Sequence, residues 1–141
     1  MSSSTAANWL RVVAIGSMLT GIVMAVGSVS DPTGVMSLFF GLVSSGDSGI
    51  GGIATPEAKL ALAVAGGVFA GFAAMFLFIV APAVKAGDAG VRRGVIISLI
   101  IWYVIDSGAS VASGNAANAV ANTGMLLLFI LPLVLVKSET A

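Results

Sequence analysis

The chain has 141 residues, of which 58% are hydrophobic and 9% are charged, with no net charge and a mean hydropathy of +1.12. A water-soluble domain could not cover such a chain with polar surface, so the composition predicts a single integral membrane domain. Cysteine and histidine are absent, which removes thiolate chemistry, zinc sites and nucleophile–histidine pairs, so we expect neither enzymatic activity nor a cofactor.

The first apolar segment predicts a membrane-spanning helix over about residues 9–30. It begins with Trp9 and Arg11, which suit a membrane interface. Its core of about 18 apolar residues is long enough to cross the hydrocarbon layer. A cleaved signal peptide is the alternative, because a lone arginine followed by an apolar run and small residues has the same layout. Asp31 and Pro32 are expected to end this span, since a charge leaves the hydrocarbon and proline cannot continue a helix.

Between the first two long helices, the sequence predicts a surface segment and a loop. Residues 33–43 are apolar but too few to cross a core of about 30 Å, so we expect a short helix on the outer membrane surface. This helix either caps the bundle or forms a re-entrant, ligand-gating segment. Residues 44–55 are rich in glycine and serine and predict a flexible external loop.

The second long helix is predicted over residues 56–84, and small residues recur along it at helical spacing. A stripe of this kind lets two helix backbones approach closely. We expect it to pack against a matching stripe on the first helix, and a homodimer interface is the alternative use. The two stripes consist of Ser17, Gly21 and Ala25 on the first helix and of Ala63, Gly67 and Gly71 on the second.

The basic residues predict the orientation of the chain. Lys59 stands alone on one side, whereas the other five basic residues share the opposite side: Arg11, Lys85, Arg92, Arg93 and Lys137. Basic residues favour the cytoplasmic side, so both termini are expected there, in a plasma membrane of the bacterial inner-membrane type. The basic residues are too scattered to form a groove that follows phosphates, which argues against a nucleic-acid partner. The expected partners are the lipid bilayer and, as an alternative, a second copy or another membrane protein.

Two further helices, over residues 94–113 and 116–136, are predicted to form a hairpin with polar residues on both arms. Asp106 and Ser110 lie one turn apart on the first arm, and Asn118 and Asn122 do so on the second. A tight turn would place these two stripes face to face, with Ser110 opposite Asn118 and Asp106 opposite Asn122. A charged residue in the middle of a span costs about 3 kcal/mol, so Asp106 should face the bundle and find hydrogen-bond donors. The candidate site residues are Trp102, Tyr103, Asp106, Ser110, Asn118 and Asn122.

Two interpretations of this polar stripe remain open. The first, which we favour, is a polar clamp between the third and fourth helices of an accessory or structural membrane protein. The second is a small proton-coupled carrier or polar-ligand-binding protein that uses Asp106 in an outward-facing pocket, because intramembrane carboxylates often mark such paths. Multidrug exporters of this size usually have a glutamate in their first helix, but no acidic residue lies between Arg11 and Asp31. That comparison argues against the exporter class.

The polar hairpin also resembles part of a known group of proteins. The segment 102–107, with Ser110, Gly114, Asn118 and Asn122 after it, is similar to the second hairpin of small four-helix membrane proteins from bacteria. This resemblance covers mainly residues 92–136 and implies a fold and a topology but no activity. The expected fold is all-α: an antiparallel bundle of four transmembrane helices with a short extra helix in the first external loop.

Overall fold

The computed structural model describes residues 1–31, 33–43 and 55–137, and these ranges contain helices and no strands. Four helical stretches are long and apolar enough to cross a membrane, as the sequence predicts: Ser3–Gly27, Pro56–Lys85, Ala89–Ala112 and Ala116–Leu135. The elements are α1 (Ser3–Gly27), α2 (Val35–Val43), α3 (Pro56–Met75), a π-helical segment (Phe76–Val80), α4 (Ala81–Lys85), α5 (Ala89–Ala112) and α6 (Ala116–Leu135).

Two of the long helices begin earlier than predicted, because polar side chains cap them. The hydroxyl of Ser2 accepts a hydrogen bond from the backbone N–H of Thr5 at 3.2 Å, so α1 begins at Ser3 and not near residue 9. Likewise, the carboxylate of Asp88 accepts from the N–H of Val91 at 2.9 Å, so α5 begins at Ala89 and not at residue 94. Most of the predicted loop over residues 44–55 lies outside the described residues.

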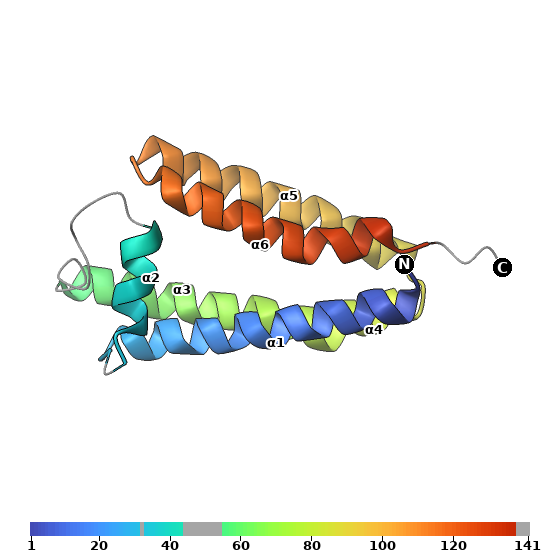
Figure 1. The fold of residues 1–141 in the computed structure, drawn as a ribbon, viewed down its shortest axis with the longest axis horizontal. Coiled ribbons are helices and arrows are strands. Elements are labelled where there is room, and N and C mark those ends of the chain that lie inside the picture. The colour runs from blue at the N-terminus through green and yellow to red at the C-terminus, as the bar shows by residue number, and fades with distance from the viewer. Residues whose placement is uncertain (32, 44–54, 138–141) are drawn as a thin grey trace.

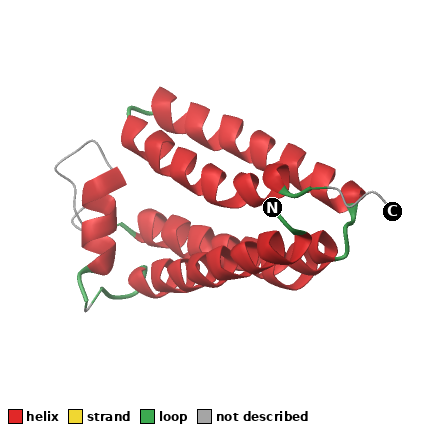
Figure 2. Ribbon diagram, turned by 45° about the vertical axis from the view of Figure 1, so that its right-hand side comes forward, coloured by secondary structure: helices red, strands yellow, loops and turns green. Residues whose placement is uncertain are grey.

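The helices form two hairpins that lie side by side. In one, α1 runs along α3 and α4, and in the other α5 runs along α6 (Figure 1). Figure 2 shows the same two pairs after a turn of the view. At the end where the termini meet, the amino group of Met1 donates to the carbonyl of Leu135 at 2.9 Å, and the N–H of Lys137 donates to the carbonyl of Met1 at 3.0 Å. These bonds tie the first helix to the last.

The contact between α1 and α3 uses the predicted Gly21 of α1 but a different glycine of α3 from those predicted. A Cβ atom on Gly21 would lie 2.7 Å from the carbonyl oxygen of Gly66, and one on Gly66 would lie 2.5 Å from the backbone nitrogen of Ala25. Gly67 and Gly71, by contrast, have open space where a Cβ atom would point. The prediction that these two glycines make the contact is wrong. A shift of one residue turns the helix by about 100°, which moves the predicted stripe off the interface.

The remaining residues of the two predicted stripes are buried to different extents. Ser17 is buried and its hydroxyl lies 3.8 Å from the sulfur of Met125 on α6, so this part of α1 also faces the second hairpin. Ala25 and Ala63 are half-buried. The side of α1 that carries Ser17 and Gly21 therefore contacts α3 and α6 together.

The best-packed core lies toward the end that holds the termini. Phe129 of α6 is completely buried, with its ring centroid 4.4 Å from that of Phe76 and 5.6 Å from that of Phe72. Leu10 of α1 and Leu99 of α5 belong to the same cluster, so every long helix contributes to it. Toward the opposite end the two hairpins diverge, and α2 lies across that end (Figure 1). The core thus holds the hairpins together at one end only.

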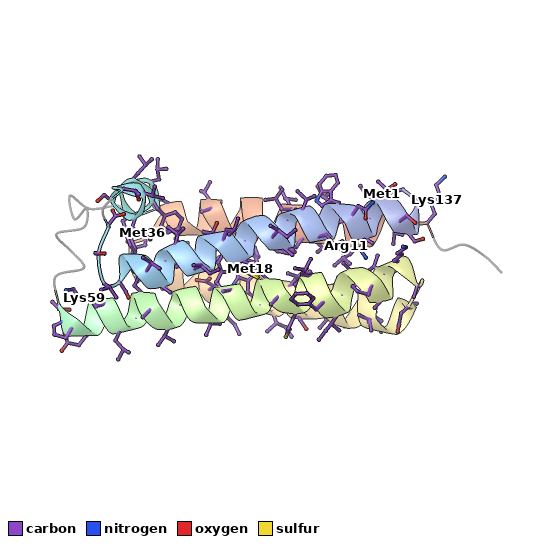
Figure 3. All side chains as sticks on the ribbon, turned by 90° about the horizontal axis from the view of Figure 1, so that it is seen from below. Met1, Arg11, Met18, Met36, Lys59 and Lys137 are labelled. Carbon is purple, nitrogen blue, oxygen red and sulfur yellow. The ribbon has the colours of Figure 1, made fainter. Side chains whose placement is uncertain are left out.

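The outer surface of the long helices is apolar. Figure 3 shows side chains projecting from the helices along their length, with Met1 and Lys137 at one end and Met36 and Lys59 at the other. Large aliphatic side chains more than half exposed occur on every long helix, and they include Val12, Leu19, Val68, Ile79, Ile101, Val104, Val120 and Val134. Many large apolar side chains are therefore not buried within the chain.

Candidate functional site

A pocket of about 680 Å³ lies between the two hairpins at the end covered by α2. Its polar wall comes from α5 and α6, and its apolar wall comes mainly from α2, α3 and α1. Of the six candidate site residues, Tyr103 is absent from the lining, and the other five contribute to it: Trp102, Asp106, Ser110, Asn118 and Asn122. The structure therefore brings most of the predicted polar stripe to a single cavity.

The turn between α5 and α6 sets the register of this polar wall. Gly114 adopts a φ of +83°, a left-handed conformation that glycine tolerates best. The backbone N–H of Asn115 then donates to the carbonyl of Ser110 at 2.8 Å and closes the turn. Across the hairpin, the side-chain amide of Asn118 donates to the hydroxyl of Ser110 at 2.8 Å. The predicted pairing of Ser110 with Asn118 is present.

Asp106 accepts only a long, weak hydrogen bond from these neighbours. The hydroxyl of Ser110 lies 3.5 Å from its Oδ1 atom, at the long limit for a hydrogen bond. A carboxylate has about four lone-pair sites, so Asp106 keeps acceptor capacity that can face the pocket. Its side chain is half-buried, which leaves it accessible from the cavity.

Asn122 has a different partner from those expected. Its amide donates to the hydroxyl of Ser107 at 3.3 Å, and both side chains are buried. Ser107 follows Asp106 directly and lies about 100° further around the helix, so it faces α6 while Asp106 faces the cavity. Ser107 was not among the predicted site residues, although it directly follows Asp106 in the polar part of α5.

The side chain of Tyr103 forms its hydrogen bond outside the cavity. Its hydroxyl lies 2.9 Å from the hydroxyl of Thr123, which in turn donates to the carbonyl of Ala119 at 2.8 Å. Thr123 is a second residue that sequence reasoning missed, because a lone threonine near the middle of an apolar helix has no distinctive spacing. Tyr103 therefore joins α5 to α6 and is not part of the pocket lining.

The short helix α2 covers the pocket with two aromatic rings. Phe39 and Phe40 both line it, with ring centroids 5.7 Å apart, and Phe69 of α3 lines it as well. Residues 33–43 were expected to form a surface helix, and α2 occupies Val35–Val43 of that range. The structure places this helix at the cavity, and the choice between a capping helix and a re-entrant segment stays a prediction.

Asp31 holds the beginning of α2 and does not end α1, which stops at Gly27. Its two carboxylate oxygens accept hydrogen bonds from the backbone N–H groups of Met36 at 3.3 Å and Ser37 at 3.0 Å. Burial acts to raise the pKa of Asp31, but the hydrogen bonds from Ser37 and Met36 outweigh it and leave the pKa below its usual value. Asp31 is therefore charged near neutral pH, and its charge stabilises the N-terminus of α2.

Few ionisable or metal-binding groups are found among the described residues of the pocket. Among the described residues that line it, Asp106 is the one ionisable side chain, and none is a lysine or an arginine. Within the part of the chain that the structure describes, no three potential ligands come together to hold a metal ion. The cavity can therefore offer one carboxyl group, amide and hydroxyl groups, and an apolar wall.

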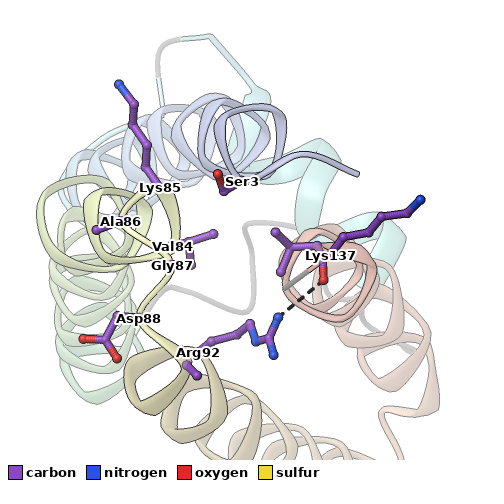
Figure 4. A pocket seen from close by; sticks show the side chains of 10 residues that line it. Ser3, Val84, Lys85, Ala86, Gly87, Asp88, Arg92 and Lys137 are labelled. Atoms are coloured by element: carbon purple, nitrogen blue, oxygen red, sulfur yellow. Dashed lines mark hydrogen bonds between the residues drawn. The ribbon is translucent and has the colours of Figure 1, made fainter. Parts of the chain in front are cut away.

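A second, smaller pocket of about 320 Å³ lies at the end with the termini (Figure 4). Arg92 points into it and donates to the carbonyl of Val136 at 3.4 Å. Lys85 and Lys137 also line it, but their side chains extend away from the cavity. The guanidinium of Arg92 therefore links α5 to the end of α6.

Comparison of the chain with protein-family models, with curated proteins and with solved structures gives no match.

Proposed function

We propose that the chain is a non-enzymatic membrane protein that binds a small ligand at Asp106, in the pocket between its two hairpins. The single observation that carries the proposal is the position of Asp106, which lines a cavity of about 680 Å³ and is not sealed between α5 and α6. A cavity of this size is within the range of roughly 300 to 1,000 Å³ that ligand pockets occupy.

The membrane setting is supported by the length and surface of the helices. The four long helical stretches have 25, 30, 24 and 20 residues and mean hydropathies of 1.9 to 2.3. A span of about 20 apolar residues matches the thickness of a bilayer. Exposed aliphatic side chains along each stretch would contact lipid, and the hairpins would form an antiparallel bundle of four transmembrane helices.

The proposed orientation follows from the distribution of charge. Met1 and Lys137 lie together at one end, and Lys59 lies at the other (Figure 3). Because the basic residues concentrate at the end with the termini, this end is proposed to face the cytoplasm of a bacterial-type plasma membrane. The Asp106 pocket and α2 would then be on the external side.

A structural clamp is the second candidate function, and specific hydrogen bonds favour it. Ser110 bonds to Asn118, and Ser107 bonds to Asn122, so polar groups do join α5 to α6. An accessory or structural protein would need only these bonds. The two candidates differ in whether small solutes reach the pocket from outside.

Because the chain has no cysteine, a single introduced thiol can test this access. We expect Ser110→Cys to react with a water-soluble, membrane-impermeant maleimide added to the external side, since Ser110 lines the pocket. The matched control is Ser98→Cys, on the same helix but exposed on its apolar outer surface, where lipid would shield it from the reagent. Both variants should react fully after denaturation in detergent.

The opposite result would support the clamp. If Ser110→Cys stays unlabelled while Glu57→Cys, which is exposed near the beginning of α3 and absent from the pocket lining, reacts, the pocket is closed to solutes. The function would then be structural, and the proposed ligand site would be wrong.

A further inference from the structure

The charge and the walls of the pocket indicate which class of ligand it would hold. In the described part of the lining, Asp106 is the one ionisable side chain, and its hydrogen-bond donor, the hydroxyl of Ser110, is at 3.5 Å. The amide of Asn118 is already bonded to Ser110 and does not neutralise the carboxylate. An ionised Asp106 would therefore have no positive partner among the described lining residues, which favours a cationic ligand over an anion.

Aromatic side chains from three helices line the same pocket as Asp106. Phe39 and Phe40 come from α2, Phe69 comes from α3, and Trp102 comes from α5, one turn before Asp106. Aromatic rings attract cations through the negative electrostatic potential of their faces, most strongly where water is excluded. They also provide a large apolar surface for the rest of a ligand.

Apolar side chains make up much of the remaining lining. Met24 of α1 and Met125 of α6 contribute unbranched thioether side chains, and small residues such as Ala61 and Ala65 of α3 leave room between them. Methionine adjusts its shape to different apolar groups. This wall would accept an apolar body, while the amide and hydroxyl groups of the pocket belong mainly to α5, α6 and the turn between them.

Building on the proposed ligand site, we infer that its ligand is a lipophilic organic cation, with the positive centre beside Asp106 and the apolar body among the aromatic rings. A small inorganic cation would leave most of the 680 Å³ unfilled. A neutral lipid chain would fill the apolar wall but leave the carboxylate without a counter-charge.

The test compares two probes of nearly equal shape and opposite charge, tetraphenylphosphonium and tetraphenylborate. Binding is measured by equilibrium dialysis of the full chain in lipid nanodiscs, and uptake by empty nanodiscs is subtracted because both ions partition into lipid. We expect saturable, protein-dependent binding of the cation and none of the anion. Asp106→Asn should weaken cation binding by about tenfold or more, since it removes a charge-assisted contact while keeping the side-chain shape.

The matched control is Asp88→Asn, which removes the same charge at the opposite end of the molecule. Asp88 caps α5, and asparagine is an equally good cap, so this variant should fold and bind the cation normally. Circular dichroism establishes that each variant keeps its helix content. Should Asp106→Asn fail to fold, Asp106→Glu, which keeps the charge, should retain cation binding, and the comparison of the two probes on the unaltered chain needs no variant at all.

Three results would overturn the inference: equal binding of both probes, no saturable binding of the cation, or full cation binding by a folded Asp106→Asn. If Ser110→Cys is nevertheless labelled from outside, the ligand pocket stands and only the cationic class is wrong. If Ser110→Cys is not labelled and the cation does not bind, both proposals fail.

Discussion

At the residue scale, two neighbouring glycines of α3 have opposite surroundings. A Cβ atom on Gly66 would lie 2.5 Å from the backbone nitrogen of Ala25 and 2.6 Å from the carbonyl oxygen of Gly21. Both atoms belong to the backbone of α1, so they cannot move aside without shifting the helix. A Cβ atom on Gly67 would meet nothing within 4 Å.

We therefore expect Gly66→Ala to destabilise the protein by about 1–3 kcal/mol, as overpacking of a close contact does. Gly67→Ala is the matched control and should be neutral or slightly stabilising, since alanine favours the helix more than glycine does. Reversible unfolding in mixed detergent micelles, followed by circular dichroism, measures the difference. Equal stability of the two variants would mean that α1 and α3 do not approach at Gly66.

At the scale of a single element, α2 is a nine-residue helix that depends on Asp31 at its N-terminus. The folded-state pKa of Asp31 is lower than the ordinary aspartate value, so ionised Asp31 stabilises the folded arrangement. This contribution is present above the unfolded-state pKa of about 3.9 and is lost as pH falls through the lower folded-state pKa. The hydrogen bonds that hold the N-terminus of α2 on Asp31 should therefore weaken only at acid pH.

Hydrogen exchange can measure this effect with Asp31→Ala as the comparison. At neutral pH, the amides of residues 35–43 should exchange faster in the variant than in the unaltered chain, because the N-terminal cap is missing. As the pH falls below the usual aspartate range, the ratio of the two rates should approach one. Taking the ratio at each pH cancels the intrinsic pH dependence of exchange. A ratio of one at neutral pH would contradict the capping role of Asp31.

At the scale of the whole molecule, the two ends of the hairpins carry different charges and different pockets. If the end with the termini faces the cytoplasm, Ser113→Cys at the far turn should react with an impermeant thiol reagent on intact spheroplasts. Ser4→Cys, near the N-terminus, should react only after permeabilisation. Both serines are exposed, so a difference in labelling reports the side of the membrane and not burial. The reverse pattern would place the Asp106 pocket on the cytoplasmic side.

Much of the secondary structure could be predicted from local sequence. The four long apolar stretches are recognisable because length and hydropathy are properties of consecutive residues. α1 and α5 begin earlier than hydropathy predicts because Ser2 and Asp88 cap them. Hydropathy alone does not report such caps. The pairing of Ser110 with Asn118 was also predictable, since a tight turn fixes which residues of a hairpin face each other.

The tertiary structure alone decided which helix faces meet and what lies between the hairpins. Gly66 and not Gly67 packs against α1, because the rotation of α3 about its axis is set by the partner helix. Phe39 and Phe69 join Asp106 at one pocket although they are distant in the chain, because α2 and α3 lie opposite α5 there. Hydropathy within a segment determines that a helix forms, but the shape of its neighbours determines how it is turned and which residues share a cavity.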